Sequence, residues 1–262
     1  MDRWSKLWNM SKFPVAGFWL LVAGGVLAQD ARQIVTESQD RSRVKSQRYE
    51  GTLEVIGASN KVSTKRWTYQ RISSFGTSKA ILRFTAPLEL KGLALLIVNH
   101  PDRASDQWMW TPALERERRI ALQDRSTRFF GTDFSFEDLE ERDVNLFDYK
   151  MAGEEAIDGA PCWKIETKPR ESKSSQYSSS VLWIRKDNYV TAQVESYANA
   201  KLARRIHYSD LEKIDNIWTP RNVEVLDAAR NSRTVLKIEK MQYNAPMKDE
   251  DFTLEALRRA SS

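Results

Sequence analysis

Apolar and polar side chains alternate with a period of two through most of this 262-residue chain. Leu53 and Val55, for example, fall on one side of an extended strand, and Glu54 between them falls on the other. Such alternation is typical of antiparallel strands that bury one face and expose the other. The sequence therefore predicts a mainly β protein whose sheet must cover one apolar face.

The alternating segments predict roughly eleven to thirteen strands and only a few short helices. The strands are expected at residues 49–55, 65–72, 79–84, 93–98, 107–110, 118–121, 147–157, 161–168, 177–186, 190–198, 202–213, 217–226 and 233–244. Helices are expected over 29–47 and 249–258, with a further short one from Ser135, where Ser135 and Asp138 resemble a capping box. Residues 123–142 lose the alternation otherwise.

A sheet of about twelve strands at ~4.8 Å spacing would be about 55 Å wide, and a sheet of that width curls or closes. The predicted helices are too few to cover it as a flat layer. We therefore expect a curved antiparallel sheet that forms an incomplete, half-open β-barrel, with a few helices covering an apolar cavity. A fully packed barrel or a two-sheet sandwich is the alternative that the pattern leaves open.

The first 28 residues have the three-part pattern of a secretory signal peptide. Basic residues precede an apolar run from Phe13 to Leu27, and the run ends in Val26-Leu27-Ala28 before the polar Gln29. A membrane anchor is the alternative, but this run is shorter than the ~20 residues that a spanning helix needs. We expect cleavage after Ala28, a single domain over 29–262, a periplasmic location and no stable membrane insertion after cleavage.

The charge and the cysteine content of the sequence argue against a nucleic-acid partner and against an internal disulfide. Residues 1–28 carry a net charge of +2, which leaves about +3 of the chain's +5 on the mature protein. Basic and acidic residues alternate along the chain, so we expect a solvated mixed surface and no nucleic-acid partner. Cys162 is the only cysteine, and His100 and His207 are the only histidines, so no internal disulfide forms and a packed thiol is the preferred interpretation.

The aromatic and aliphatic residues of the predicted strands give the candidate binding site. Large side chains on the concave side of a curved sheet can line a cavity, although each can equally be ordinary core. The candidates, each on the more apolar face of its strand, are Leu53, Val55, Trp67, Tyr69, Phe84, Trp108, Trp110, Trp163, Ile165 and Trp183.

Several motifs, taken in order, resemble those of the outer-membrane lipoprotein-sorting (LolA-like) family, and more closely its uncharacterised branch. They are Phe84-Thr85-Ala86-Pro87, Lys91-Gly92, Leu95-Leu96, Trp108-Met109-Trp110-Thr111-Pro112, Arg116, Arg118-Arg119-Ile120, Phe130-Gly131-Thr132-Asp133-Phe134-Ser135-Phe136-Glu137-Asp138-Leu139, Cys162-Trp163-Lys164-Ile165, Leu182-Trp183-Ile184, Trp218-Thr219-Pro220 and Asp249-Glu250-Asp251-Phe252-Thr253. The resemblance covers residues 48–256. It implies an unclosed barrel with a helical lid over an apolar cavity, and carriage of lipoprotein acyl chains through the periplasm.

Two of these motifs have a structural as well as a functional interpretation. Gly131 can set a turn, Asp133 or Ser135 can cap a helix, and Phe134 and Phe136 can pack against the core; we favour this over direct ligand contact. The basic residues at 116, 118 and 119 could meet lipid headgroups or a partner, but a solvated face is the preferred interpretation.

The function predicted from the sequence is therefore a periplasmic carrier that shields lipoprotein acyl chains or lipids. The rival is a periplasmic accessory or lipid-sensing module that works with an inner-membrane RND-type exporter, a partner suggested only by the family resemblance. No Gly-x-Ser-x-Gly elbow, His-Glu-x-x-His motif or Cys/His metal spacing occurs in the sequence. We therefore predict no enzyme activity, no catalytic residue, no cofactor and no metal site.

Overall fold

The computed structural model describes residues 30–259. The predicted signal peptide and its cleavage site before Gln29 lie outside the described residues. Within 30–259, no helix combines the length and hydropathy that crossing a membrane would require.

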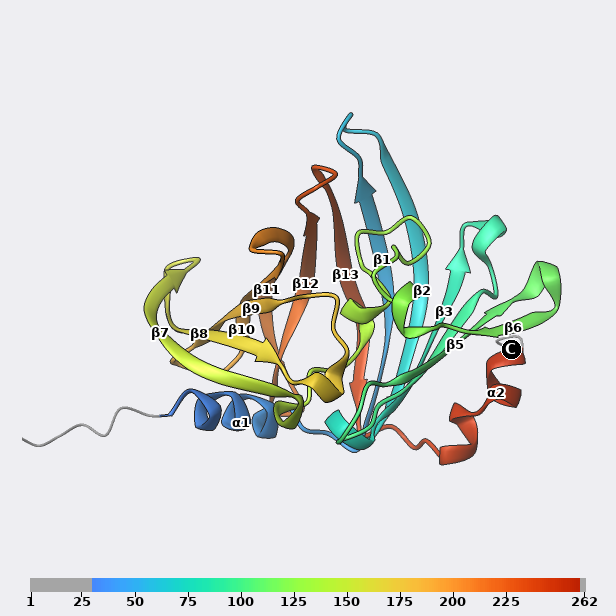
Figure 1. The fold of residues 1–262 in the computed structure, drawn as a ribbon. Coiled ribbons are helices and arrows are strands. Elements are labelled where there is room, and N and C mark those ends of the chain that lie inside the picture. Colours follow the sequence, from blue (N-terminus) through green and yellow to red (C-terminus); the bar gives the residue numbers. More distant parts are fainter. Residues whose placement is uncertain (1–29, 260–262) are drawn as a thin grey trace, which may run out of the picture.

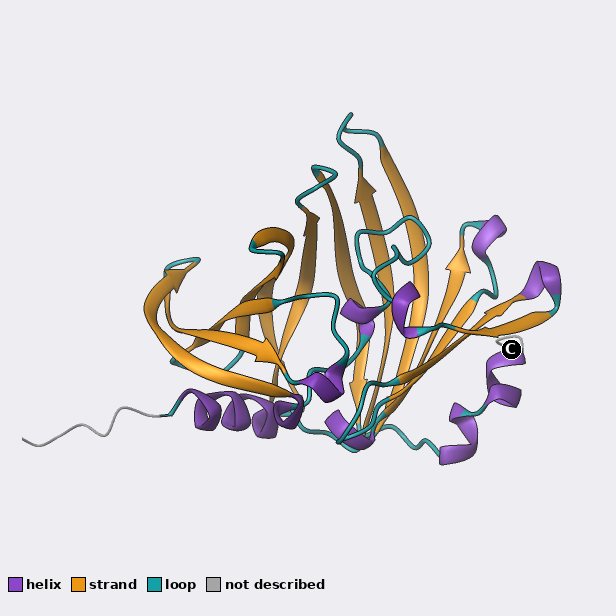
Figure 2. Ribbon diagram, viewed as in Figure 1, coloured by secondary structure: helices purple, strands orange, loops and turns teal. Residues whose placement is uncertain are grey.

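A single antiparallel sheet contains all thirteen strands of the described chain (Figures 1 and 2). The strands are β1 Ser46–Ile56, β2 Val62–Ile72, β3 Lys79–Ala86, β4 Ala94–Val98, β5 Asp106–Thr111, β6 Arg116–Arg119, β7 Phe147–Ile157, β8 Ala160–Pro169, β9 Ser179–Arg185, β10 Thr191–Ala198, β11 Lys201–Ile214, β12 Ile217–Asp227 and β13 Ser232–Tyr243. Their order across the sheet is β6-β5-β4-β3-β2-β1-β13-β12-β11-β10-β9-β8-β7, so β1 and β13 meet in the middle.

The sheet curves without closing, which confirms the predicted incomplete barrel (Figure 1). Its two edge strands are protected from pairing with other chains in different ways. β6 is short and its sequence is Arg-Glu-Arg-Arg, a run of charges that disfavours a further strand. β7 carries a bulge between Met151 and Gly153, where Gly153 adopts a φ of 118° that other residues rarely reach.

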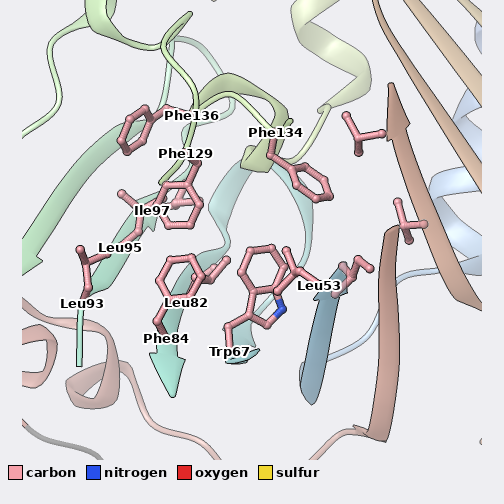
Figure 3. Packing of buried hydrophobic residues seen from close by; sticks show 14 of the residues in the cluster. Leu53, Trp67, Leu82, Phe84, Leu93, Leu95, Ile97, Phe129, Phe134 and Phe136 are labelled. Carbon is pink, nitrogen blue, oxygen red and sulfur yellow. The ribbon is translucent and has the colours of Figure 1, made fainter. Parts of the chain in front are cut away.

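The concave face of the sheet is filled on one side by residues 122–146, which we call the plug segment. The plug segment connects β6 to β7 and contains the short 3₁₀ turns Leu122–Asp124, Glu137–Leu139 and Val144–Leu146. Figure 3 shows Phe129, Phe134 and Phe136 of this segment packed over Trp67 and Phe84 of the sheet. The Phe129 ring stacks on Phe84 with centroids 5.4 Å apart. The N-terminal half of the barrel is therefore a packed aromatic core.

Helix α1 (Ala31–Arg41) covers part of the other half of the concave face (Figure 1). It begins at Asp30, whose side chain caps the first turn, and its buried residues Ala31, Ile34 and Val35 pack against β8, β9 and β10. The sequence predicted a helix over 29–47, and the structure confirms it. The helix is shorter than predicted, because β1 already begins at Ser46.

Helix α2 (Leu254–Arg258), with the 3₁₀ turn Asp249–Phe252 before it, lies on the convex face. Phe252 and Leu257 pack against Ile81 and Leu96, which point away from the plug segment. Both faces of β3 and β4 are consequently buried. The expectation that the helices cover the concave side is therefore correct for α1 and wrong for α2.

Candidate functional site

Seven of the ten predicted lining residues do point to the concave face: Leu53, Val55, Trp67, Tyr69, Phe84, Trp163 and Ile165. They do not surround an open cavity, however. Leu53, Trp67 and Phe84 are buried under the plug segment, and Ile165 is buried under α1. Their positions on the sheet agree with the prediction, but packing against the plug segment and α1 makes most of them core.

Trp108, Trp110 and Trp183 lie on the convex face, so their assignment to the cavity is wrong. Trp108 and Trp110 pack against the cluster that α2 covers, and their neighbours Gln107 and Met109 face inward instead. Trp183 packs with Cys162 and Ala192 on the convex face. The residues next to each tryptophan in the sequence can also be buried. The alternation of side chains therefore does not determine which face the tryptophan occupies.

A hollow of about 290 Å³, which we call the inner hollow, lies between α1, the plug segment and strands β9 to β11. Its apolar wall comes from the concave side of these strands and from Val35 of α1, and its polar wall comes from the plug segment and from Lys173 and Tyr177 beside it. The lining residues are Val35, Ser38, Gln39, Ser42, Phe75, Glu137, Asp138, Glu140, Glu141, Arg142, Phe147, Lys173, Tyr177, Leu182, Ile184, Thr191, Val194, Ser196, Ile206 and Tyr208. None of the ten predicted residues is among them.

The hollow exists because the apolar stripe of α1 stops halfway along the helix. Ile34 and Val35 pack onto the sheet, but the following positions on the same face are Ser38 and Ser42. These short polar side chains do not fill the space that larger apolar side chains would occupy. The change from aliphatic to hydroxyl side chains along one helix face is the signal that the sequence offered for this site.

A second depression of about 550 Å³, which we call the mouth, shares Ser38, Ser42, Thr191 and Tyr208 with the inner hollow. Tyr189, Trp218 and the cations Arg41 and Lys213 also line it. The two spaces adjoin through the shared residues, so a ligand longer than the inner hollow could extend into the mouth. Trp218, with 41% of its surface exposed, presents an amphipathic ring where such a ligand would meet water.

The carboxylates on the polar wall are each held by a cation or by hydroxyl groups. Glu140 accepts hydrogen bonds from Arg125 at 2.7 Å and from Lys173 at 2.8 Å. Lys173 also lies 3.5 Å from Glu137. All four side chains are at least nine-tenths buried. Glu141 pairs with Arg71 in the same way. These carboxylates are therefore neutralised by neighbours and fix the plug segment in place.

Asp138 accepts hydrogen bonds from the Ser135 backbone N–H and from the Tyr177 hydroxyl, both at 2.7 Å. Ser135 Oγ in turn accepts from the Asp138 N–H, so the predicted capping box is present, although it begins only a single 3₁₀ turn. Burial raises the pKa of the Asp138 carboxyl above its ordinary value, and hydrogen bonds from Ser135 and Tyr177 partly oppose that rise. Burial also raises the pKa of the Tyr177 hydroxyl, and the charge of Asp138 adds to that rise.

The Gly131-Thr132-Asp133-Phe134 block has the structural role that we favoured. Gly131 forms a turn with a φ of 73°, and Phe134 packs on Trp67 with ring centroids 6.0 Å apart. Asp133 does not cap a helix. Its buried carboxylate instead accepts hydrogen bonds from Ser232 at 2.6 Å and from Thr234 at 2.8 Å, both on β13. The block therefore fastens the plug segment to the middle of the sheet.

Cys162 and the histidines lie away from the inner hollow. Cys162 is fully buried on the convex face, where its Sγ–H donates to the Ala160 carbonyl at 3.3 Å, and burial raises the pKa of its thiol. His100 lies 2.9 Å from Asp106, and His207 lies 2.9 Å from Asp158. Among residues 30–259, no group of three or more His, Cys, Asp or Glu side chains is arranged to hold a metal ion. The inner hollow, which has an aliphatic wall and a polar wall, is suited to binding an amphiphile.

Comparison with known proteins agrees with this architecture. A family model described as uncharacterized-protein-like matches residues 76–259. No curated protein matches the chain in sequence. A solved domain from Vibrio parahaemolyticus, named for outer-membrane lipoprotein sorting, is 23% identical, with a TM-score of 0.83 over 87% of this chain and 98% of its own.

Two further solved structures are similar to the chain. A DUF1329 family protein from Desulfovibrio piger is 26% identical, with a TM-score of 0.82 over 87% of this chain and 97% of its own. A LolA superfamily protein from Nitrosomonas europaea is 20% identical, with a TM-score of 0.70 over 87% of this chain and 100% of its own. The family model matches more than half of the chain, so the chain belongs to this uncharacterised (DUF1329) family, and it has the fold of the LolA superfamily structure.

Proposed function

We propose that this protein is a periplasmic carrier that shields acyl chains of lipids or lipoproteins during transfer towards the outer membrane. The observation that carries the proposal is the inner hollow, an apolar-walled space on the concave face of an open curved sheet, beneath α1. The names of the Vibrio and Nitrosomonas structures support the same class of function for this fold.

The size and lining of the two adjoining spaces support a chain-shaped ligand. Leu182, Ile184 and Ile206 offer aliphatic surface in the inner hollow, and the mouth extends this space towards Trp218. Burial of about ten methylene groups would contribute about 8 kcal/mol, which corresponds to roughly micromolar affinity. Binding of this kind requires no chemical step, so we propose that the protein is not an enzyme.

Helix α1 is the element that would have to move for a bulky ligand to enter. Polar contacts hold it to the plug segment: Arg32 donates to the Val144 carbonyl at 3.2 Å and to the Asn145 side chain at 2.7 Å. Gln39 adds a hydrogen bond to the Arg142 carbonyl. Such contacts can break and reform in water at small net cost. Release would then follow when an acceptor binds the lipid more tightly than the carrier does.

A space-filling substitution tests this proposal without burying a charge. Ser38 lies on α1 and lines both the inner hollow and the mouth, so Ser38→Trp should occupy the ligand's space. Gln33→Trp is the matched control, because Gln33 is exposed on the same helix. We expect Ser38→Trp to reduce uptake of a fluorescent fatty acid at least tenfold, and Gln33→Trp to leave uptake within about twofold of the wild type.

Equal uptake by the two variants would contradict this location of the ligand. The cellular location has its own test, because export requires removal of the predicted signal peptide. N-terminal sequencing of protein from the periplasm should begin at Gln29, whereas an intact Met1 in a membrane fraction would contradict the predicted cleavage.

A further inference from the structure

Arg142 differs from every other charged residue that lines the inner hollow. Among the lining residues the cations are Arg142 and Lys173, and Lys173 is already held between Glu137 and Glu140. Arg142 forms no ion pair with any residue from 30 to 259. Its Nη2 donates to Thr167 Oγ1 at 3.2 Å, and its guanidinium lies 4.3 Å from the centre of the Phe147 ring.

These two contacts position the guanidinium but leave most of its hydrogen-bonding capacity unused. A guanidinium carries five N–H donors in a rigid planar fork, and Thr167 takes one of them. The other four have no protein acceptor in the part of the chain that the structure describes. Thr167 is buried on the concave face of β8, and Phe147 begins β7 at the wall of the hollow. Arg142 is therefore held beside the hollow by neutral groups.

Two tyrosine hydroxyls share this environment. Tyr208 lines both the inner hollow and the mouth. Tyr149 and Tyr208 both pack against the apolar cluster that α1 forms with β8, β9 and β10. Burial raises the pKa of each hydroxyl to about 12, and the nearby charge of Arg142 lowers both pKa values by a smaller amount. Neither hydroxyl makes a hydrogen bond to any residue between 30 and 259. Both therefore remain protonated donors close to an unpaired guanidinium.

None of the four carboxylates of the polar wall forms an ion pair with Arg142. Glu137, Glu140 and Glu141 are paired with lysine or arginine, and Asp138 lies 3.6 Å from Arg204 and is capped by hydroxyl and backbone donors. Their negative charge is thus compensated by Arg71, Lys173 and Arg204, which lie outside the plug segment, and by Arg125 within it. Among the described residues that line the inner hollow, Arg142 is therefore the one cation that no carboxylate neutralises, and aliphatic side chains line the same hollow.

We propose that Arg142 receives the anionic headgroup of the lipid, a carboxylate or a phosphate, while the acyl chain lies along Leu182, Ile184 and Ile206. This inference rests on the proposed carrier function and specifies its cargo as an anionic lipid in preference to a neutral one. Carboxylate and phosphate oxygens both match the fork of a guanidinium, which forms two parallel hydrogen bonds to either group.

The test compares ligands that share one chain and differ in the headgroup. A fluorescent fatty acid bound to the purified full-length protein is displaced with oleate, oleyl phosphate or oleyl alcohol, and separately with inorganic phosphate. The variants are Arg142→Gln, Arg142→Lys and the control Arg48→Gln, which removes an exposed arginine on β1. All variants are first shown to have the wild-type circular dichroism spectrum.

We expect the wild type and Arg48→Gln to bind oleate and oleyl phosphate at least about tenfold more tightly than oleyl alcohol. Arg142→Gln should bind all three with similar affinity, and its affinity for oleyl alcohol should match that of the wild type. Arg142→Lys should keep part of the preference, because lysine retains the charge but not the fork. Inorganic phosphate should displace nothing, because it lacks the acyl chain.

Three outcomes would overturn the inference alone. The first is equal affinity of the wild type for oleate and oleyl alcohol, and the second is a headgroup preference that survives in Arg142→Gln; either would leave the carrier function standing. The third is displacement by inorganic phosphate alone, which would show a free-anion site. A wild type that binds no oleyl compound would instead overturn the carrier function, and the inference with it.

Discussion

The link between Asp133 and β13 is one of the contacts that hold the plug segment against the sheet. Asp133 is fully buried, with 0% of its surface exposed, and accepts hydrogen bonds from Ser232, Thr234 and Arg128. Its backbone N–H also donates to Thr234 Oγ1 at 2.8 Å. The carboxylate thus joins a loop residue to two positions on a central strand.

Replacement of Asp133 by alanine would leave two buried hydroxyls and one arginine without their shared acceptor. Hydrogen bonds to a charged acceptor contribute about 1.5–3 kcal/mol each, and loss of one partner of a buried ion pair costs about 3–5 kcal/mol. Because the Arg128 side chain keeps some contact with water, the total cost of losing these hydrogen bonds and the ion pair should fall at the lower end of what the separate costs add up to. We expect Asp133→Ala to lower the free energy of unfolding by about 3–5 kcal/mol, and Asp133→Asn by roughly half as much.

Urea denaturation followed by circular dichroism measures this effect. The control is Asp102→Ala, an exposed aspartate that should change stability by less than about 0.5 kcal/mol. Thr234→Val should cost about 1.5–3 kcal/mol in the wild type but much less in Asp133→Ala, because the acceptor is already gone. A double-mutant cycle should therefore give a coupling energy of about 1–3 kcal/mol.

Strict additivity of the two substitutions would refute this reasoning. So would an Asp133→Ala protein within about 1 kcal/mol of the wild type, because a cost that small is typical of surface positions. Either result would mean that the aromatic contacts of Figure 3 hold the plug segment without help from Asp133.

Three further predictions test other parts of the structure. Ile165→Glu should lower the free energy of unfolding by more than about 4 kcal/mol, because it buries a charge without a partner. Lys164→Glu breaks an exposed convex-face pair with Glu155 and a cation–π contact with Trp183, and should cost only about 1–2 kcal/mol in the same denaturant titration. Cys162→Ser should cost about 1–2 kcal/mol and leave fatty-acid uptake unchanged in the folded protein; loss of uptake by that folded variant would contradict a structural role. Burial raises the pKa of Asp138 above 3.8, so its contribution to stability is fully present below that pH and is lost as the pH rises through the folded-state pKa. The stability of the wild type relative to Asp138→Asn should therefore increase as the pH falls from 7 to about 4, and a constant difference across that range would exclude a raised pKa.

The strands were predictable because alternation is a local property of the sequence. The predicted segment 202–213, for example, became β11 with bounds Lys201–Ile214, and 217–226 became β12 with bounds Ile217–Asp227. Curvature followed from strand number alone. Neither inference needs knowledge of which distant residues meet.

The site was less predictable because it depends on what covers each face. Trp67 and Phe84 were correctly placed on the concave face, but Phe129 and Phe134 of the plug segment fill the space above them. A loop without alternation gives no direction for its side chains, although Phe134 and Phe136 were expected to pack against the core. The remaining space lies under α1, where Ser38 follows Ile34 and Val35 on the same helix face.

The convex-face tryptophans show a second limit. Alternation assigns a face only when one face is polar, and the convex face of β3, β4 and β5 is apolar because the C-terminal turn and α2 pack on it. Trp108 next to Met109 could then point either way. The ion pairs of the plug segment were equally inaccessible to sequence analysis, because Lys173 and Glu137 are 36 residues apart and no local pattern connects them.

Mass spectrometry of the lipid that accompanies the protein tests the carrier function most directly. The protein would be purified from its own periplasm without detergent and analysed both intact and as an organic extract, with Ser38→Trp as the variant in which the inner hollow is filled. We predict about one bound lipid per protein, with a carboxylate or phosphate headgroup, and loss of that lipid from Ser38→Trp. A wild-type protein that carries no lipid, and takes up no fatty acid afterwards, would contradict the carrier function and favour the accessory module of an inner-membrane exporter.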